Sequence, residues 1–231
     1  MSLMTNAVFV AARKALRRAG LSSMLAALVY GRKYEEAYDN MMTVNIRPGD
    51  HLWDIGANHG LYTLKFVELT GPQGSIDCFE PSAKNLAILR PAIQPHPNIK
   101  LHEVGLSDQS GTVSFVQDNS ASGVGNRITA TDGESSDSEI KVVRAEEVID
   151  ATPDSVPDVI KIDVEGHELH VLRGFGDCLK DTKIRCIGVE VHFSLLEAQG
   201  LSGAANQIES LLKAAGFKVN WTDPSHIVAL R

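Results

Sequence analysis

The stretch WDIGANHG, residues 53–60, has the residue types of a ligand-binding turn between a strand and a helix. Its spacing is D-x-G-x-N-x-G, with Asp54, Gly56, Asn58 and Gly60. A dinucleotide fingerprint that began at Gly56 would need two further glycines, where this chain has Asn58 and Leu61. Pyrophosphate prefers bare backbone N–H groups, so a carboxylate at this turn instead suits a ligand with positive charge or hydroxyl donors.

A second acid follows the turn at the distance expected for a ribose contact. Glu80 ends the next predicted strand, about 20 residues further on, where a carboxylate can accept hydrogen bonds from two ribose hydroxyls. S-adenosylmethionine combines a ribose with an ammonium and a sulfonium group, and the small Gly56-Ala57 pair lets such a ligand approach the backbone. Asp54 and Glu80 together therefore predict an S-adenosylmethionine site.

A further group of ionisable residues follows two later strands. Asp163 and Glu165 come after the apolar run at 158–162, and Glu190 and His192 come after the run at 184–189. Such side chains could remove the proton from a reacting hydroxyl, and His192 has the ordinary pKa best placed for that at neutral pH. We predict Asp163, Glu190 and His192 as the catalytic residues, although each could instead cap a helix or hold a loop. Lys161, inside the apolar strand, is expected to pair with an acid at the site.

The same catalytic residues allow a second interpretation. Asp163, Glu190 and His192 could ligate a divalent ion, since carboxylates and imidazole suit such metals. Nothing in their spacing defines a coordination geometry, so no metal is predicted.

Five stretches of the chain resemble the FkbM-type S-adenosylmethionine-dependent methyltransferases. They are WDIGANHGLYT, CFEPSAKNLAIL, EVGLSDQSGTVSF, DVIKIDVEGHELHVLRG and IGVEVH, in the family's order across residues 50–192. The resemblance implies the class I methyltransferase sheet. It also implies a cofactor site with Asp54, Gly56, Asn58 and Gly60 on the methionine and ribose side, Glu80 on the ribose diol, Leu106 and Ser107 beside the adenine, and Asp163 at the reacting centre.

The elements that must position these residues alternate between strand and helix from His51 onward. This alternation predicts a doubly wound, mostly parallel α/β sheet of the Rossmann-like kind. A short turn at 223–225 joins the last two strands, so the last strand is expected to be antiparallel. Residues 111–118 and 139–145 alternate with period two and predict an added β-hairpin.

The chain divides into two predicted parts. Residues 1–49 are expected to form an N-terminal helical segment, in which residues 1–3 precede a second methionine, Met4, and are interpreted as a cloning remnant. Residues 50–231 are expected to form the catalytic domain. The polar stretch 117–138 is interpreted as a lid over the substrate, with a disordered insertion as the alternative.

The composition of the chain limits the classes of partner that the protein can bind. A net charge of −7 over 231 residues argues against nucleic acid, and no apolar run approaches the length of a membrane span. The three cysteines lack metal-binding spacing, and Cys78 and Cys186 lie in apolar runs, which indicates buried thiols in a reducing compartment. No secretion signal is evident, so we expect a cytoplasmic protein. The N-terminal helices are a possible contact between copies of the chain.

The predicted reaction is methylation of a hydroxyl on a small molecule or sugar. The sequence is also compatible with three alternatives: a methyltransferase that acts on protein or RNA, a catalytically silent S-adenosylmethionine-binding protein, and an NAD-dependent dehydrogenase.

Overall fold

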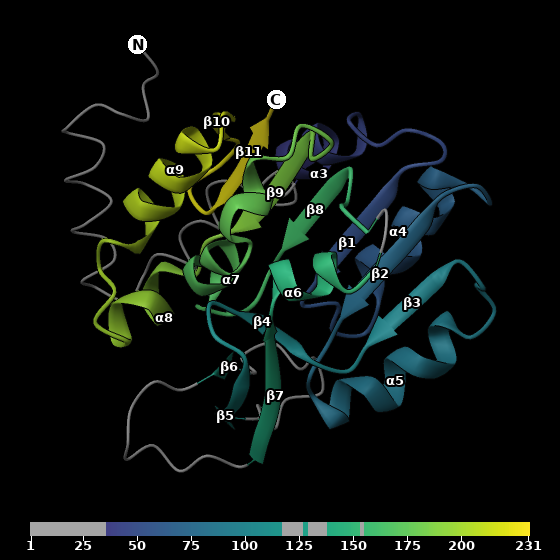
Figure 1. The fold of residues 1–231 in the computed structure, drawn as a ribbon, viewed down its shortest axis with the longest axis horizontal. Coiled ribbons are helices and arrows are strands. Elements are labelled where there is room, and N and C mark those ends of the chain that lie inside the picture. Colours follow the sequence, from purple (N-terminus) through teal and green to yellow (C-terminus); the bar gives the residue numbers. More distant parts are fainter. Residues whose placement is uncertain (1–35, 117–126, 129–137, 153–154) are drawn as a thin grey trace.

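The structure is a computed structural model that describes residues 36–116, 127–128, 138–152 and 155–231 (Figure 1). Its main element is a seven-stranded sheet with the strand order β10-β11-β9-β8-β1-β2-β3. The strands are β1 (His51–Ile55), β2 (Ser75–Phe79), β3 (Ile99–His102), β8 (Val159–Ile162), β9 (Cys186–Glu190), β10 (Lys218–Trp221) and β11 (His226–Leu230). The first strand, β1, lies in the middle of the sheet, and β2 and β3 follow it toward one edge. The later strand β8 pairs with the other side of β1, and β9, β11 and β10 continue toward the opposite edge. The carboxyl ends of β1 and β8 therefore meet at the point where the strand order reverses, which is the usual ligand site of such sheets.

The reversed strand is β11, as the short turn predicts. It pairs antiparallel with both β9 and β10 and so lies between them. All the other neighbours in the main sheet are parallel. This mostly parallel α/β sheet with an antiparallel last strand confirms the fold class.

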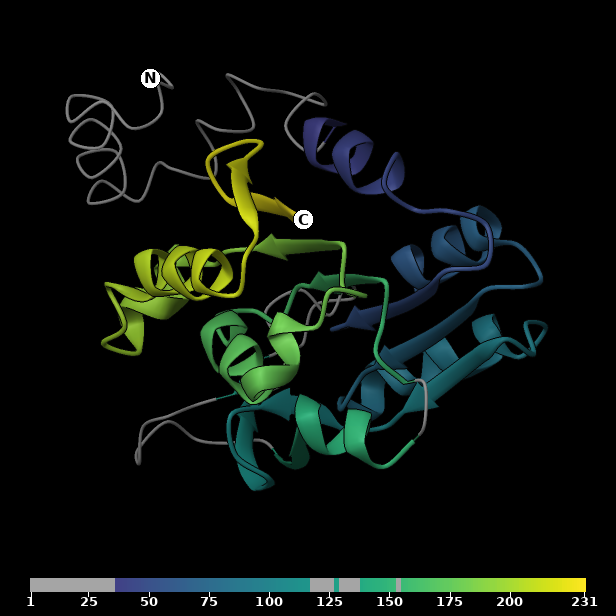
Figure 2. The same cartoon turned by 45° about the horizontal axis from the view of Figure 1, so that its top comes forward.

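Helices cover both faces of the sheet (Figure 2). One face packs against α3 (Glu36–Thr43), α4 (Leu61–Thr70) and α5 (Ala83–Ile93), around Leu52, Phe66 and Ile76. The opposite face packs against α6 (Ala145–Asp150), α7 (Glu168–Gly174), α8 (Phe193–Ala198) and α9 (Ala204–Ala214). The strands β1 and β8 are buried on both faces because both faces are covered.

A second sheet lies below the carboxyl ends of the main strands in the view of Figure 1. It has the order β4-β7-β5-β6, built from β4 (Gly105–Ser107), β5 (Gly111–Val116), β6 (Arg127–Ile128) and β7 (Ser138–Arg144). The predicted hairpin is confirmed, since β5 and β7 are antiparallel partners. The pattern of residues 98–107 predicts one continuous strand. This prediction is wrong, because the chain leaves the main sheet after His102 and enters the second sheet at Gly105.

Serine caps and glycine stops in the sequence predict four helix boundaries, and three of them are confirmed, including the end of α4 at Gly71. Ser82 caps α5, because its Oγ accepts a hydrogen bond from the Asn85 N–H at 3.5 Å. Gly216 follows α9 with a φ of +96°, the conformation that lets a glycine end a helix. The expected cap of α9 at Ser202 is wrong, since the cap position is Gly203 and no side chain bonds the first turn.

Several predictions concern residues outside the described ones. The N-terminal helices before residue 36 and most of the 117–138 segment fall there. The described end of the N-terminal segment is α3, whose Tyr38 and Met42 are buried against the main sheet. Cys78 and Cys186 are buried free thiols, as expected.

Candidate active site

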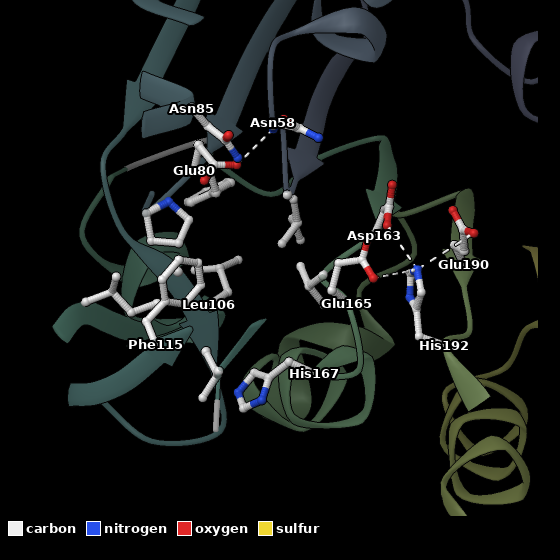
Figure 3. Close-up of a pocket in the computed structure, with 18 residues that line it drawn as sticks. Asn58, Glu80, Asn85, Leu106, Phe115, Asp163, Glu165, His167, Glu190 and His192 are labelled. Carbon is white, nitrogen blue, oxygen red and sulfur yellow. Dashed lines mark hydrogen bonds and ion pairs between the residues drawn. The ribbon is translucent and has the colours of Figure 1, made fainter. Parts of the chain in front are cut away.

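A cavity of about 440 Å³ opens at the carboxyl ends of the central strands (Figure 3). Its walls come from the turn after β1, the ends of β2, β8 and β9, and the second sheet. The lining residues are Ile55, Gly56, Asn58, Phe79, Glu80, Pro81, Asn85, Gly105, Leu106, Phe115, Ile128, Ile140, Asp163, Val164, Glu165, His167, Glu190 and His192.

The glycine turn is pressed against the neighbouring strand ends. A Cβ at Gly56 would lie 1.8 Å from the Asp163 carbonyl oxygen, and the φ of Gly56 is +80°, so glycine is required there. The N–H groups of Gly56 and Ala57 both donate to the Phe79 carbonyl at 3.0 Å. The turn therefore forms a closely fitted floor whose position depends on both β2 and β8.

Asp54 lies behind this floor. It is fully buried, its Oδ2 accepts from the Thr63 hydroxyl at 2.6 Å, and its Oδ1 lies 3.2 Å from the Lys161 ammonium. Lys161 also lies 3.5 Å from Asp163 Oδ2 and donates to the Gly56 carbonyl at 3.3 Å. Lys161 thus pairs with acids at the site, as predicted, and Asp54 holds the turn in place and does not line the cavity.

The predicted cofactor residues accordingly fall into two sets. Gly56, Asn58, Glu80, Leu106 and Asp163 line the cavity, whereas Asp54, Ala57, Gly60 and Ser107 do not. The residues that do not line the cavity contact its walls from behind. A Cβ at Gly60 would lie 2.7 Å from Leu89, and the Ser107 hydroxyl shares a hydrogen bond with the lining residue His167.

One end of the cavity presents hydrogen-bond acceptors. Glu80 Oε2 accepts from the Asn58 N–H and its Oε1 from the Ser82 N–H, both at 2.8 Å, and burial raises the pKa of this carboxyl to about 7. Asn85 lies beside it, and its buried Oδ1 has no hydrogen-bond partner within the described structure. These oxygens suit the hydroxyl donors of a ribose.

The middle of the cavity is apolar. Leu106 from β4 and Phe115, Ile128 and Ile140 from β5, β6 and β7 form a wall suited to a flat base. His167 completes it. Burial, and then the charge of His170, lower the pKa of His167 to about 3, so this imidazole is neutral and shares a 2.9 Å hydrogen bond with Ser107.

Of the apolar side chains in this wall, the sequence predicted Leu106 as a cofactor residue. Phe115 and Ile140 come from the predicted hairpin, but alternation alone does not indicate that their row faces a ligand.

The opposite end of the cavity holds the predicted catalytic residues. His192 Nε2 lies 3.3 Å from Glu165, 3.7 Å from Glu190 and 3.8 Å from Asp163. On its other side, His192 Nδ1 lies 2.7 Å from Glu168 Oε1. The structure therefore brings all three predicted residues together, along with Glu165 and Glu168.

The protonation of this cluster differs from the expectation. Burial opposes the charged imidazole, but the hydrogen bond to Glu168 and the nearby carboxylates outweigh it and raise the pKa of His192 to about 10. Burial raises the pKa of Asp163, whereas hydrogen bonding from His226 and the charge of His192 overcome burial and lower that of Glu190. At neutral pH His192 is thus a cation, and Glu190 is a carboxylate.

Three atoms of the cluster lie close enough to hold a divalent ion. Asp163, Glu165 and His192 each offer a ligand atom, and these atoms lie within 4.8 Å of one another. His192 already forms ion pairs with Asp163 and Glu165, and Asp163 also pairs with Lys161. We therefore assign no metal to them.

The strand order, the reversed β11 and the cavity at the carboxyl ends define a class I methyltransferase fold of the Rossmann-like type. Precorrin-6y C5,15-methyltransferase from Geobacter metallireducens has the same fold, with a TM-score of 0.51 and 16% identity over 87% of this chain and 89% of that one. Fibrillarin from Aeropyrum pernix, solved with natively bound S-adenosyl-L-methionine, gives a TM-score of 0.50 and 14% identity over 90% of this chain and 73% of that one.

The chain belongs to the FkbM methyltransferase family, because residues 54–219 match the methyltransferase FkbM domain. It is 30% identical over 144 residues to the hexuronic acid methyltransferase AglP of Haloferax volcanii, and the match covers 62% of this chain. The matched part is 56% of AglP, so this chain spans just over half of that relative. It is also 28% identical over 205 residues to the 31-O-demethyl-FK506 methyltransferase FkbM of Streptomyces tacrolimicus, over 76% of this chain and 75% of that protein.

Family and fold together assign S-adenosylmethionine as the cofactor. The cavity fits it, since acceptor oxygens, an apolar wall and carboxylates follow one another along its length. None of the helices in the described part of the chain has the length and apolar composition that a bilayer span requires.

Proposed function

We propose that the protein transfers a methyl group from S-adenosylmethionine to a hydroxyl oxygen of a sugar or another small molecule. The names of three relatives support this acceptor class: AglP, the 31-O-demethyl-FK506 methyltransferase, and the 2-O-methyltransferase NoeI of Sinorhizobium fredii. NoeI is 33% identical over 69 residues, which is 30% of this chain and 28% of that protein.

The observation that carries the proposal is the pair of carboxyl groups, Asp163 and Glu190, in the wall of the cavity. Asp163 and Glu190 line it opposite the Glu80 end, with the His192 cation between them (Figure 3). A hydroxyl is a weak nucleophile until its proton is removed, and a carboxylate within hydrogen-bond reach can accept that proton.

The cofactor, when bound, supplies an electrophilic methyl group on a cationic sulfur. The protein's own residues then have two tasks. Glu80 and Asn85 anchor the nucleoside end, so that the acceptor is held at the other end of one rigid cavity. Glu190 accepts the hydroxyl proton, while hydrogen bonding from His226 and the positive charges of His192 and Lys161 keep its carboxyl ionised.

The proposal is tested by methyl transfer from tritiated S-adenosylmethionine to a panel of acceptors. The panel contains neutral methyl hexosides, a hexuronic acid and simple aliphatic alcohols, and the measurement is tritium in the product. We expect transfer to at least one sugar, and Glu190→Gln should lower kcat by about tenfold or more, because the amide cannot take the proton.

Two controls accompany this test. Binding of S-adenosylhomocysteine to Glu190→Gln should match the wild type within about twofold, since Glu190 lies away from the nucleoside end. Glu103→Gln is the matched variant, because Glu103 is an exposed acid paired with Arg90 at 2.7 Å and does not line the cavity. Absence of product with every hydroxyl acceptor would refute the proposal.

A further inference from the structure

Glu190 lies between two histidines. His192 Nε2 lies 3.7 Å from Glu190 Oε1, and His226 Nε2 lies 3.5 Å from Glu190 Oε2. One imidazole therefore faces each oxygen of the carboxylate.

Each histidine is oriented in the same way, by a buried carboxylate on its other nitrogen. Glu168 Oε1 lies 2.7 Å from His192 Nδ1, and Asp223 Oδ2 lies 2.8 Å from His226 Nδ1. Glu168 is fully buried and Asp223 nearly so. With Nδ1 engaged in both rings, each Nε2 is the nitrogen left to face Glu190.

The backbone places His226 directly beside Glu190. The two residues are cross-strand partners in the antiparallel pairing of β11 with β9. His226 is 2% exposed, and the Tyr38 ring from α3 packs on it with a centroid distance of 4.5 Å. His226 does not line the cavity, so it can act on an acceptor only through Glu190.

We propose that His226, oriented by Asp223, is a positioning residue that holds Glu190 as an ionised carboxylate facing the methyl acceptor. This role rests on the proposed function, in which Glu190 accepts the hydroxyl proton. His226 lies in β11, outside the five stretches that resemble the FkbM family, and this proposal gives it a part in the reaction.

The charges around Glu190 are consistent with this role. His226, His192 and Lys161 are the cationic groups that lower the pKa of Glu190 against the effect of burial. The other titratable groups nearby are Asp163, which contacts His192, and Tyr38, whose phenol has a pKa raised by burial. Burial opposes the protonated form of His226, yet Asp223 and Glu190 raise its pKa to about 9, so His226 is a cation at neutral pH.

The alternative is a purely structural role in the turn between β10 and β11. Asp223 Oδ1 also accepts from the N–H groups of Ser225 and His226, each at 2.9 Å, so the Asp223–His226 contact could serve the turn alone. Two substitutions separate the roles. His226→Asn retains a donor near the Nδ1 position and can preserve the Asp223 contact, whereas His226→Gln retains a donor near Nε2 and can preserve the Glu190 contact.

The experiment measures the titration of Glu190 by carbon-13 NMR of protein labelled at the glutamate carboxyl carbon, with Glu190→Gln assigning the signal. We expect His226→Asn to raise the titration midpoint of Glu190 by about one pH unit, and His226→Gln to raise it less. With the best acceptor of the sugar panel, His226→Asn should lower kcat by about tenfold and shift its acid limb to higher pH, while KM for S-adenosylmethionine stays within about twofold.

The matched control is His102→Asn. His102 is a second mostly buried histidine on a carboxylate, 2.5 Å from Asp77, and it lies outside the cavity. It should leave the Glu190 midpoint unchanged. An unchanged midpoint in His226→Asn, or an equal shift in His102→Asn, would overturn the inference. The NMR result requires no acceptor, so a wild type that transfers no methyl group would count against the proposed function alone.

Discussion

Two acids that look alike in the sequence have different places in the structure. Asp54 and Glu80 each end a strand next to the glycine turn, and both were predicted to contact the cofactor. Asp54 is turned away from the cavity and held by Thr63 and Lys161, whereas Glu80 lines the wall. The spacing of the turn identifies the pair, but the direction of each side chain depends on which neighbours offer a hydrogen-bond donor.

At the residue scale, we predict that Glu80→Gln removes a pH dependence of cofactor-product binding. Burial raises the pKa of Glu80 to about 7, so the carboxylate that best accepts ribose hydroxyls forms as the pH rises through that value. The affinity of the wild type for S-adenosylhomocysteine should increase several-fold between pH 6 and pH 8, and that of Glu80→Gln should stay flat. Titration calorimetry measures both.

The same substitution has a stability signature. A carboxyl whose folded pKa is raised stabilises the fold below its unfolded pKa and loses that contribution as the pH rises through the folded value. The free energy of unfolding of the wild type relative to Glu80→Gln should thus fall between about pH 5 and pH 8, by on the order of 3 kcal/mol at most. A difference that grows with pH would contradict the assignment.

At the scale of elements, the cavity depends on how closely α7 packs on the second sheet. A Cβ at Gly174 in α7 would lie 2.1 Å from the Ser107 carbonyl oxygen in β4. Because this neighbour is backbone, the contact cannot be relieved by a rotamer change. The helix carries Glu168 and follows His167, and the strand carries Leu106, so their separation sets the width of the apolar wall.

We therefore predict that Gly174→Ala destabilises the fold by about 1–3 kcal/mol and weakens S-adenosylhomocysteine binding. Chemical denaturation and calorimetry measure the two effects. Gly203→Ala is the control, since the nearest atom to its added Cβ would lie 3.7 Å away and its φ is −94°. Equal effects of the two substitutions would show that the contact between Gly174 and β4 does not determine the stability of the fold or the binding of the ligand.

The element-scale errors of the sequence interpretation share one cause. The stretch 98–107 has the apolar pattern of a single strand, but β3 and β4 belong to different sheets. Periodicity reports which residues are buried and not which neighbour buries them. The second sheet, and with it the wall made by Phe115 and Ile140, depends on pairings between segments far apart in the chain.

At the scale of the whole molecule, ligand binding should stabilise the fold selectively. A ligand that binds only the folded state at 100 times its Kd adds about 2.7 kcal/mol to the free energy of unfolding. S-adenosylhomocysteine should therefore raise Tm by several degrees, and NAD at the same concentration should leave it unchanged. Thermal unfolding measures both, and stabilisation by NAD alone would contradict the cofactor assignment.

The sequence by itself determined the fold class, the family and the cofactor, because these depend on local patterns: the glycine turn, the alternation of strands and helices, and the IKIDVEGHELHVLRG motif. It also placed Asp163, Glu190 and His192 near one another, since carboxyl ends of neighbouring parallel strands meet at one edge. Only the tertiary structure decided that Asp54 is buried behind the turn, that His192 is a cation, and that His226 faces Glu190. These properties depend on side chains that are far apart in the chain and meet only in the folded protein. Their burial and the charges around them cannot be derived from any single stretch of residues.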